Sequence, residues 1–247
     1  MKALYYGETD IGNVRPKNED NFVLKEVWGG THLLAVVIDG VGGNGGGYIA
    51  AELAARCISE HFYESERISN SLDVLLAAVI FANNSICAQH YNPYSQMSCV
   101  LTAVLLDLKT GMVDVCHVGD TRLYMFKDGT LTKITSDHSL VGPLEESGKY
   151  TEQQAMTHPR RNIITKSIGK EVLHFGTDYI QTHTLQLEPC TLLLCSDGLY
   201  DMVHSYTTAQ ILGEKTPVEE RVDKLVAAAL AAGGKDNVTV LVIDLMT

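Results

Sequence analysis

Apolar residues recur with the period of an amphipathic helix in two stretches of the first half of the chain. The first stretch runs from about Gly47 to Phe62, and the second follows Asn70 and continues to Cys87. In each stretch the apolar side chains fall on one face, which is typical of a helix that packs on a core. The sequence therefore predicts two helices in succession here.

A third helix is predicted near the end of the sequence, where local signals mark both of its boundaries. Thr216 is the expected N-cap, Pro217 the first helical residue, and Glu219 the residue that closes a capping box. Gly233-Gly234 is the expected stop, because glycine readily adopts the left-handed backbone that ends helices.

The predicted strands are nearly continuous apolar runs, which is typical of strands buried on both faces. These runs are Leu33–Ile38, Val100–Leu106, Leu192–Cys195 and Val238–Ile243. Short hairpin-type turns at Asp107–Gly111 and Lys127–Gly129 favour antiparallel pairing. Antiparallel strands with both faces covered predict a fold of the α+β class, a four-layer α/β/β/α sandwich of two antiparallel sheets flanked by helices. No linker or repeat interrupts the chain, so we expect a single domain over residues 1–247.

Composition narrows the possible partners. The 247 residues carry 19 Lys and Arg against 30 Asp and Glu, a net charge of −11, and nucleic acid is an unfavourable partner for such a chain. The six cysteines form no Cys-x-x-Cys pair, so reduced, packed thiols are expected. The longest apolar run, Val74–Ala82, is too short to span a membrane, and the N-terminal residues do not resemble a signal peptide. We therefore expect a cytoplasmic protein with no membrane partner.

The segment Gly40–Gly45 formally matches the G-x-G-x-x-G pattern of dinucleotide-binding sites. Asp39 directly before it would repel a pyrophosphate, and the elements that follow do not continue as a parallel β-α-β unit. No Lys-Ser or Lys-Thr follows, which also excludes a P-loop. The glycines are better explained by a close approach of the backbone to a small charged group, with Gly40 offering a bare carbonyl.

Four aspartates lie at the ends of predicted apolar strands. They are Asp39, Asp120, Asp197 and Asp236. Each one alone reads as an ordinary turn residue. Together, they would repel one another unless a cation neutralised them, and oxygen ligands without His or Cys suit Mg²⁺ or Mn²⁺ better than Zn²⁺. A shared divalent-cation site is therefore the better explanation of all four.

Short motifs around these aspartates occur in the order of one enzyme family. The motifs are Thr9-Asp10-Ile11-Gly12-Asn13-Val14-Arg15-Pro16-Lys17-Asn18-Glu19-Asp20, Asp39-Gly40-Val41-Gly42-Gly43, Gly119-Asp120-Thr121-Arg122, Ser196-Asp197-Gly198 and Asp236-Asn237, with Asp137-His138-Ser139 to Gly169 as a flap region. The sequence thus resembles the PP2C (PPM) family of metal-dependent serine/threonine protein phosphatases, in its single-domain bacterial form. This resemblance also implies the α/β/β/α sandwich.

The resemblance implies a ligand set for two Mn²⁺ or Mg²⁺ ions, with a third ion often found in bacterial members. By the family pattern, Asp39 would bridge the two metals, and the Gly40 carbonyl would bind the second one. Asp197 and Asp236 would hold the first metal, and Asp120 would hold the third together with Asp197.

Three further residues take roles by the same resemblance. Glu19 and Asp20 would act in the outer shell through metal-bound waters, and Arg15 would grip the substrate phosphate. A hydroxide bridging the metals would attack phosphoserine or phosphothreonine in line, without a phosphoenzyme. The expected partners are phosphorylated proteins and a cognate Ser/Thr kinase.

The match departs from the family in two places. Val41 stands where some members carry a histidine proposed as general acid, so the proton must come from a metal-bound water or from another residue. His138 and His158 are candidates only because their motifs match. Ser98-Cys99-Val100 replaces the usual Gly-Thr-Thr at the start of a core strand. The alternative function is a catalytically weak pseudophosphatase that binds phosphoproteins or a partner, although such proteins usually lose metal aspartates.

Overall fold

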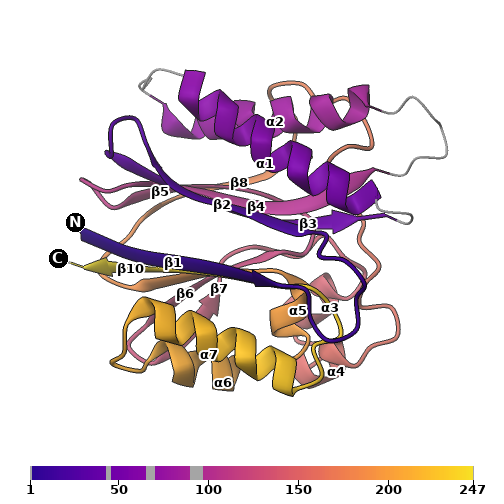
Figure 1. Ribbon diagram of the computed structural model, residues 1–247, viewed down its shortest axis with the longest axis vertical. Coiled ribbons are helices and arrows are strands. Elements are labelled where there is room, and N and C mark those ends of the chain that lie inside the picture. The colour runs from indigo at the N-terminus through magenta and orange to yellow at the C-terminus, as the bar shows by residue number, and fades with distance from the viewer. Residues whose placement is uncertain (1, 43–45, 65–69, 90–96, 247) are drawn as a thin grey trace. The chain divides into compact units, whose positions relative to one another are not determined.

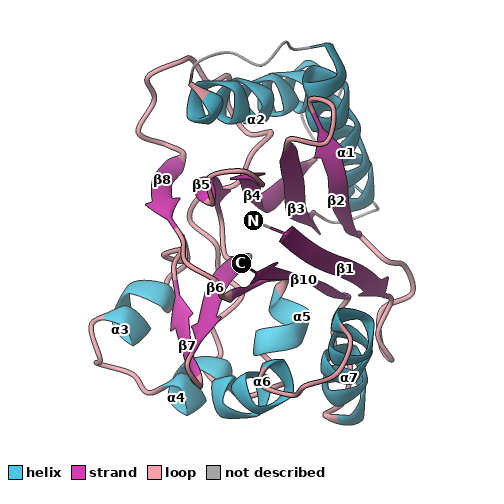
Figure 2. Ribbon diagram, turned by 90° about the vertical axis from the view of Figure 1, so that its left-hand side faces the viewer, coloured by secondary structure: helices cyan, strands magenta, loops and turns pink. Residues whose placement is uncertain are grey.

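The computed structural model describes residues 2–42, 46–64, 70–89 and 97–246, and these form two compact units. The first unit comprises Glu19–Val118 and Ser167–Glu188, and the second comprises Lys2–Asn18, Gly119–Lys166 and Pro189–Thr247. Each unit contains one five-stranded antiparallel sheet, and helices pack on it (Figures 1 and 2).

The sheet of the first unit has the strand order β2-β3-β4-β5-β8, and every neighbouring pair is antiparallel. Helices α1 and α2 lie side by side on this sheet (Figure 1). The elements of the unit are β2 (Asp20–Val27), β3 (His32–Val41), α1 (Gly46–Glu64), α2 (Ser71–Ala88), β4 (Ser98–Asp107), β5 (Met112–Val118) and β8 (Gln181–Gln186).

The core of the first unit explains the continuous apolar runs. Along β3, the alternating residues Leu34, Val36 and Ile38 pack in one cluster with the apolar faces of α1 and α2. The intervening Ala35 and Val37 are also fully buried. Burial on both faces of β3 removes the polar alternation that a half-exposed strand would show, and each fully buried Leu or Ile stabilises the fold by about 2 kcal/mol.

Helix α2 is the only helix in the described part of the chain with the length and apolar composition of a membrane-spanning segment. Half of it is buried inside the structure. Val74, Leu75, Ala78 and Val79 belong to the core cluster of the first unit. Its apolar character is thus accounted for by packing on the sheet.

The sheet of the second unit has the order β1-β10-β9-β6-β7 and is also antiparallel throughout. Alternate residues of β9 and β10 pack against the apolar face of α7. The elements are β1 (Lys2–Asp10), β6 (Arg122–Lys127), β7 (Thr130–Lys133), α3 (Gly142–Glu146), α4 (Glu152–Met156), β9 (Thr191–Cys195), α5 (Asp197–Tyr200), α6 (Ser205–Leu212), α7 (Val218–Ala231) and β10 (Val238–Met246).

The predicted fold class of two antiparallel sheets flanked by helices is confirmed. The turns at Asp107–Gly111 and Lys127–Gly129 join the antiparallel pairs β4–β5 and β6–β7, as predicted. Strand β3 is antiparallel to both of its neighbours, which excludes the parallel arrangement of a dinucleotide-binding fold. Residues 43–45 of the glycine segment lie outside the described residues.

The predicted start of the third helix is wrong by one residue. Pro217 is the N-cap of α7, with extended backbone angles, and no side chain caps the helix. Pro217 itself has a ψ of 152°, outside the helical region, so the helix begins at Val218 and the capping position falls on Pro217 instead of Thr216. Its hydroxyl is buried and, among the described residues, has no hydrogen-bond partner. Glu219 and Glu220 lie in the first turn, where their charges favour the positive end of the helix dipole.

Candidate metal and phosphate site

In the first unit, the end of β3 carries two of the predicted metal ligands, Asp39 and Gly40. Asp20 lies opposite Asp39 in the β2–β3 register, and the Gly40 amide donates to the Glu19 carbonyl at 3.1 Å. A Cβ on Gly40 would lie 2.4 Å from the Gly47 carbonyl oxygen and 2.6 Å from that of Glu19. Only glycine fits here, so the bare backbone predicted at this position is a steric requirement.

A buried and unreactive thiol pairs with one of these residues. Cys99 pairs with Gly40 in the β3–β4 register and is fully buried. Burial, reinforced by the negative charge of Asp39, raises the pKa of the Cys99 thiol well above its ordinary value. The departure at Ser98-Cys99-Val100 therefore places a packed, protonated thiol beside the candidate site.

In the second unit, Asp197 begins α5 directly after β9, and a close backbone contact holds this turn. The Ser196 amide donates to the Thr239 carbonyl at 3.1 Å, and the Thr239 amide donates to the Ser196 hydroxyl at 3.0 Å. A Cβ on Gly198 would lie 1.9 Å from the Asn237 carbonyl oxygen. The turn that carries Asp197 therefore lies directly against the residue that follows Asp236.

The segment that carries Arg15 is hydrogen-bonded to Asn237, the residue that follows Asp236. The Asn237 side-chain amide donates to the carbonyls of Ile11 at 2.9 Å and Lys17 at 3.0 Å. Arg15 Nη2 lies 2.6 Å from Asp236 Oδ2. The second unit thus brings Arg15, Asp197 and Asp236 around one hollow of about 110 Å³.

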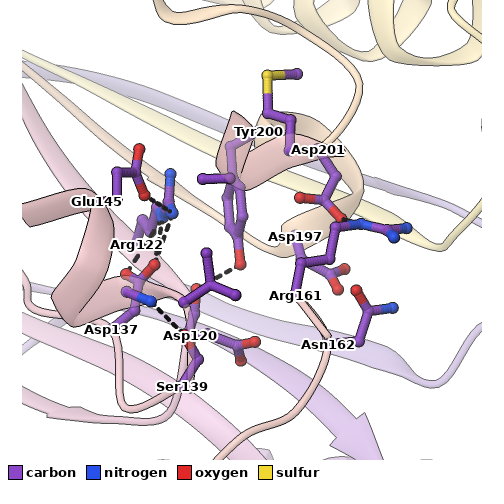
Figure 3. A pocket seen from close by; sticks show the side chains of 14 residues that line it. Asp120, Arg122, Asp137, Ser139, Glu145, Arg161, Asn162, Asp197, Tyr200 and Asp201 are labelled. Carbon is purple, nitrogen blue, oxygen red and sulfur yellow. Dashed lines mark hydrogen bonds and ion pairs between the residues drawn. The ribbon is translucent and has the colours of Figure 1, made fainter. Parts of the chain in front are cut away.

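Asp120 lines a neighbouring pocket with Asp197, as Figure 3 shows. Its carbonyl accepts a hydrogen bond from the Tyr200 hydroxyl at 3.0 Å, and the residue is only 7% exposed. Burial, and then the negative charge of Asp137, raise the pKa of the Asp120 carboxyl to about 7. The pKa of Asp201, which lines both pockets, is also raised by burial. This side of the unit is rich in carboxyl groups that additional positive charge would stabilise.

The predicted ligands are divided between the two units. Asp39 and Gly40 belong to the first unit, and Asp120, Asp197 and Asp236 belong to the second. Within either unit, the residues that the structure describes contain no group of three or more His, Cys, Asp or Glu spaced to hold a metal.

Sequence reasoning missed the role of Arg122, although it quoted this residue within a motif. Arg122 Nη2 lies 2.9 Å from Glu145 Oε2, and the guanidinium carbon lies 3.7 Å from the centre of the Tyr200 ring. Figure 3 shows the Arg122 head group with Glu145 and Asp137 beside it. Because Tyr200 also donates to the Asp120 carbonyl, Arg122 supports the position of Asp120 through this ring.

Two other side chains of the flap region, Arg161 and His138, have partners that the sequence did not predict. Arg161 Nε lies 2.5 Å from Asp201 Oδ2, and this pair lines both pockets. His138 Nδ1 accepts a hydrogen bond from the Gly119 amide at 3.0 Å. Burial, and then the charge of Lys166, lower the pKa of His138 to about 4, so this histidine is neutral near pH 7.

Comparisons with known proteins give consistent matches. The family model for protein phosphatase 2C matches residues 14–233. The serine/threonine phosphatase Stp of Listeria welshimeri is 32% identical over 243 residues, which cover 96% of this chain and 93% of that protein. PstP of Mycobacterium tuberculosis, a serine/threonine protein phosphatase, is 36% identical over 247 residues, which cover 98% of this chain and 45% of that protein.

A solved structure extends the similarity to three dimensions. The crystal structure of the catalytic domain of the serine/threonine protein phosphatase PstP, in complex with two manganese ions, aligns with a TM-score of 0.84 and 31% sequence identity. The alignment covers 99% of this chain and 99% of that one. The two chains therefore share a fold over nearly their whole length.

Proposed function

The chain belongs to the protein phosphatase 2C family, and we propose that it hydrolyses phosphoserine and phosphothreonine in proteins with Mn²⁺ or Mg²⁺ as cofactor. The observation that carries this proposal is the hollow lined by Arg15, Asp197 and Asp236. It combines a guanidinium, which matches the oxygens of a phosphate, with two carboxylates, which suit a divalent ion. In our proposal, residues 1–247 act as one phosphatase domain.

The residues present fit a divalent cation. The proposed donors are oxygens only, the backbone at Gly40 is bare by steric necessity, and Asp120 and Asp201 have raised pKa values that a cation would reverse. We propose that Asp39 serves both metals, that the Gly40 carbonyl serves the second, and that Asp197 and Asp236 hold the first. The remaining proposed members of the set are Asp120 with Asp197 for a third ion, and Glu19 and Asp20 for the outer shell. When bound, such ions activate water and neutralise phosphate oxygens.

Three of the six cysteines are excluded as nucleophiles by their burial. Cys99, Cys116 and Cys195 are fully buried. Burial raises the pKa of all three thiols, that of Cys195 to about 12, so none supplies a thiolate near neutral pH. In our proposal, Arg15 orients the phosphate for in-line attack and no phosphoenzyme forms.

The proton for the leaving alkoxide comes from a group other than His138 in this proposal. A general acid must carry its proton at the working pH, and a histidine with a pKa of about 4 does not. His138 instead accepts a hydrogen bond from the Gly119 amide, next to Asp120, which suits a positioning role. His158 Nδ1 likewise accepts from the Arg160 amide at 3.1 Å.

The proposed partners follow from this activity. The substrates are phosphorylated proteins, a cognate Ser/Thr kinase would supply them, and the cytoplasm is where both would meet. A pseudophosphatase is the competing function, because Val41 and Ser98-Cys99-Val100 depart from the family pattern. The presence of Asp39, Asp120, Asp197 and Asp236 together favours the active enzyme.

Hydrolysis of a phosphothreonine peptide by chelator-stripped protein, with and without Mn²⁺ or Mg²⁺, tests the proposal. The active enzyme releases phosphate only when metal is added, and calorimetric titration gives a matching binding isotherm. Metal binding without any phosphate release would favour the pseudophosphatase. Release that chelator does not diminish would contradict metal-dependent hydrolysis.

A further inference from the structure

A third cation, for which the proposed mechanism has no use, lines the same hollow as Arg15. This cation is Lys235, and Arg161 completes the set of positive side chains at the rim. Two of the three cations already face carboxylates. Arg15 is paired with Asp236, and Arg161 with Asp201.

Lys235 differs from both arginines. It is exposed and, among the residues that the structure describes, forms no ion pair. Asp197, Asp201 and Asp236 line this hollow with the three cations, and Lys235 is the one of these cations that is in no ion pair with them. Its ammonium group is a point charge on a flexible stem, which can follow an anion over several positions.

The backbone that carries Lys235 is held firmly in place. Gly233 and Gly234 have φ values of +130° and +51°, and a Cβ on Gly234 would lie 2.8 Å from the Asn13 side chain. The Asn13 amide donates to the Gly234 carbonyl at 2.7 Å, and its side chain donates to the Leu230 carbonyl at 2.9 Å. The loop that carries Lys235 and the segment that carries Arg15 are therefore fastened to each other within the second unit.

We propose that Lys235 is a specificity-determining residue that binds a second anionic group of the substrate, next to the phosphorylated residue held at Arg15. That group is a carboxylate from a flanking Asp or Glu, or a second phosphate. This inference rests on the proposed phosphatase function and adds a substrate preference to it. Because the pair forms at an exposed rim, it is worth up to about 1 kcal/mol, which corresponds to a preference of about three-fold to five-fold.

The test compares peptides that differ only beside the phosphothreonine. One peptide has neutral flanking residues, a second series carries glutamate at each neighbouring position, and a third carries a second phosphothreonine. The measured quantity is the ratio of kcat/KM for each anionic peptide to that for the neutral one. We expect wild type to favour one of the anionic series about three-fold, and Lys235→Met to bring this ratio to about one. The series that responds identifies the carboxylate or the phosphate as the ligand.

Two further variants distinguish a contact made by Lys235 from a general effect of positive charge on the protein surface. Lys235→Arg keeps the cation and should keep the preference, and high salt should weaken it. Lys215→Met removes an exposed lysine of the same unit that lies outside this hollow, and should leave the ratio as in wild type.

Specific results would overturn the inference. It fails if wild type shows no preference, if Lys235→Met retains the preference, or if Lys215→Met abolishes it equally. If wild type still hydrolyses the neutral peptide with Mn²⁺ in such a case, only the inference fails and the proposed function stands. If wild type hydrolyses none of the peptides with Mn²⁺, the proposed function is overturned and the inference fails with it.

Discussion

Arg122 and Asp137 form a buried ion pair in which Nη2 lies 2.6 Å from Oδ2 and Nε lies 3.0 Å from the same oxygen. The two side chains are 8% and 3% exposed. The pair joins the start of β6 to the loop that precedes α3, and Lys133 adds a second cation 3.3 Å from Asp137 Oδ1. A charged group buried to this degree is held in one geometry by its partners, and removing one partner leaves the other without compensation.

Arg122→Met should therefore destabilise the protein strongly. The substitution keeps much of the apolar stem but leaves Asp137 as a buried charge with one cation fewer, a change that costs about 3–5 kcal/mol. Urea unfolding of the metal-free protein measures this loss as a lower midpoint. Arg122→Lys retains the charge but loses the planar fork, so its loss should be smaller. Equal midpoints for wild type and Arg122→Met would show that the pair contributes nothing.

Gly198→Ala should disturb the candidate site through the backbone. The added Cβ would meet the Asn237 carbonyl oxygen at 1.9 Å, so the turn that carries Asp197 must move away from Asp236. We expect a loss of about 1–3 kcal/mol in stability together with weaker Mn²⁺ binding in a calorimetric titration. Gly213→Ala is the control, because a Cβ there would lie 3.2 Å from the end of the Phe126 ring and no closer than 3.3 Å to any backbone atom. Normal Mn²⁺ affinity in Gly198→Ala would contradict the close contact.

The lowered pKa of His138 predicts how stability depends on pH. Burial, and then Lys166, lower the pKa from its ordinary value of 6.5 to about 4 in the folded protein. Between these values the unfolded chain binds more protons than the folded one, so this contribution to stability is fully present above pH 6.5. It is lost as the pH falls toward 4.

His138→Asn tests this assignment by thermal unfolding between pH 4 and pH 7. The Asn Oδ1 can still accept the Gly119 amide hydrogen bond but does not titrate in this range. The variant should therefore show a flatter decline of its unfolding midpoint than wild type. Curves of identical slope would exclude His138 as a source of acid sensitivity.

Asp120→Ala should chiefly weaken binding of a third metal ion and slow turnover. Asp120 lines a pocket with Asp197, and we propose that the two serve that ion together. The activity of wild type and variant is measured over a series of Mn²⁺ concentrations. The variant should need more metal and reach a lower maximum. A metal dependence indistinguishable from wild type would exclude a role for Asp120 in metal binding.

The sequence predicted the elements of the fold well, because buried strands and tight turns can be recognised from short stretches of residues. Continuous apolar runs and short turns such as Asp107–Gly111 identified the central strands and their antiparallel pairing. Thr216 is not the cap because Pro217 lies outside the helical region, so α7 begins one residue later than the motif predicted. Competing local signals of this kind are difficult to rank from a sequence.

Polar contacts between distant parts of the chain could not be predicted. Asn83 lies within the apolar pattern of α2. Its side chain accepts a hydrogen bond from the Gly169 amide and donates one to the Glu171 carbonyl, each at 2.8 Å. Arg122 pairs with Asp137 in the loop after β7 and with Glu145 in the short helix α3, and the sequence pattern does not fix where either lies. Motif order pointed to the candidate ligands, but tertiary contacts alone revealed the groups that hold them in place.

The central claim is that Asp39 belongs to a metal site on which phosphate release depends. The most direct measurement is hydrolysis of a phosphothreonine peptide by Asp39→Asn in excess Mn²⁺, beside wild type and the control Asp128→Asn, which alters an aspartate in the β6–β7 turn. We predict that Asp39→Asn folds, as circular dichroism would show, and releases no phosphate, whereas Asp128→Asn has wild-type activity. Full activity of folded Asp39→Asn would contradict the claim.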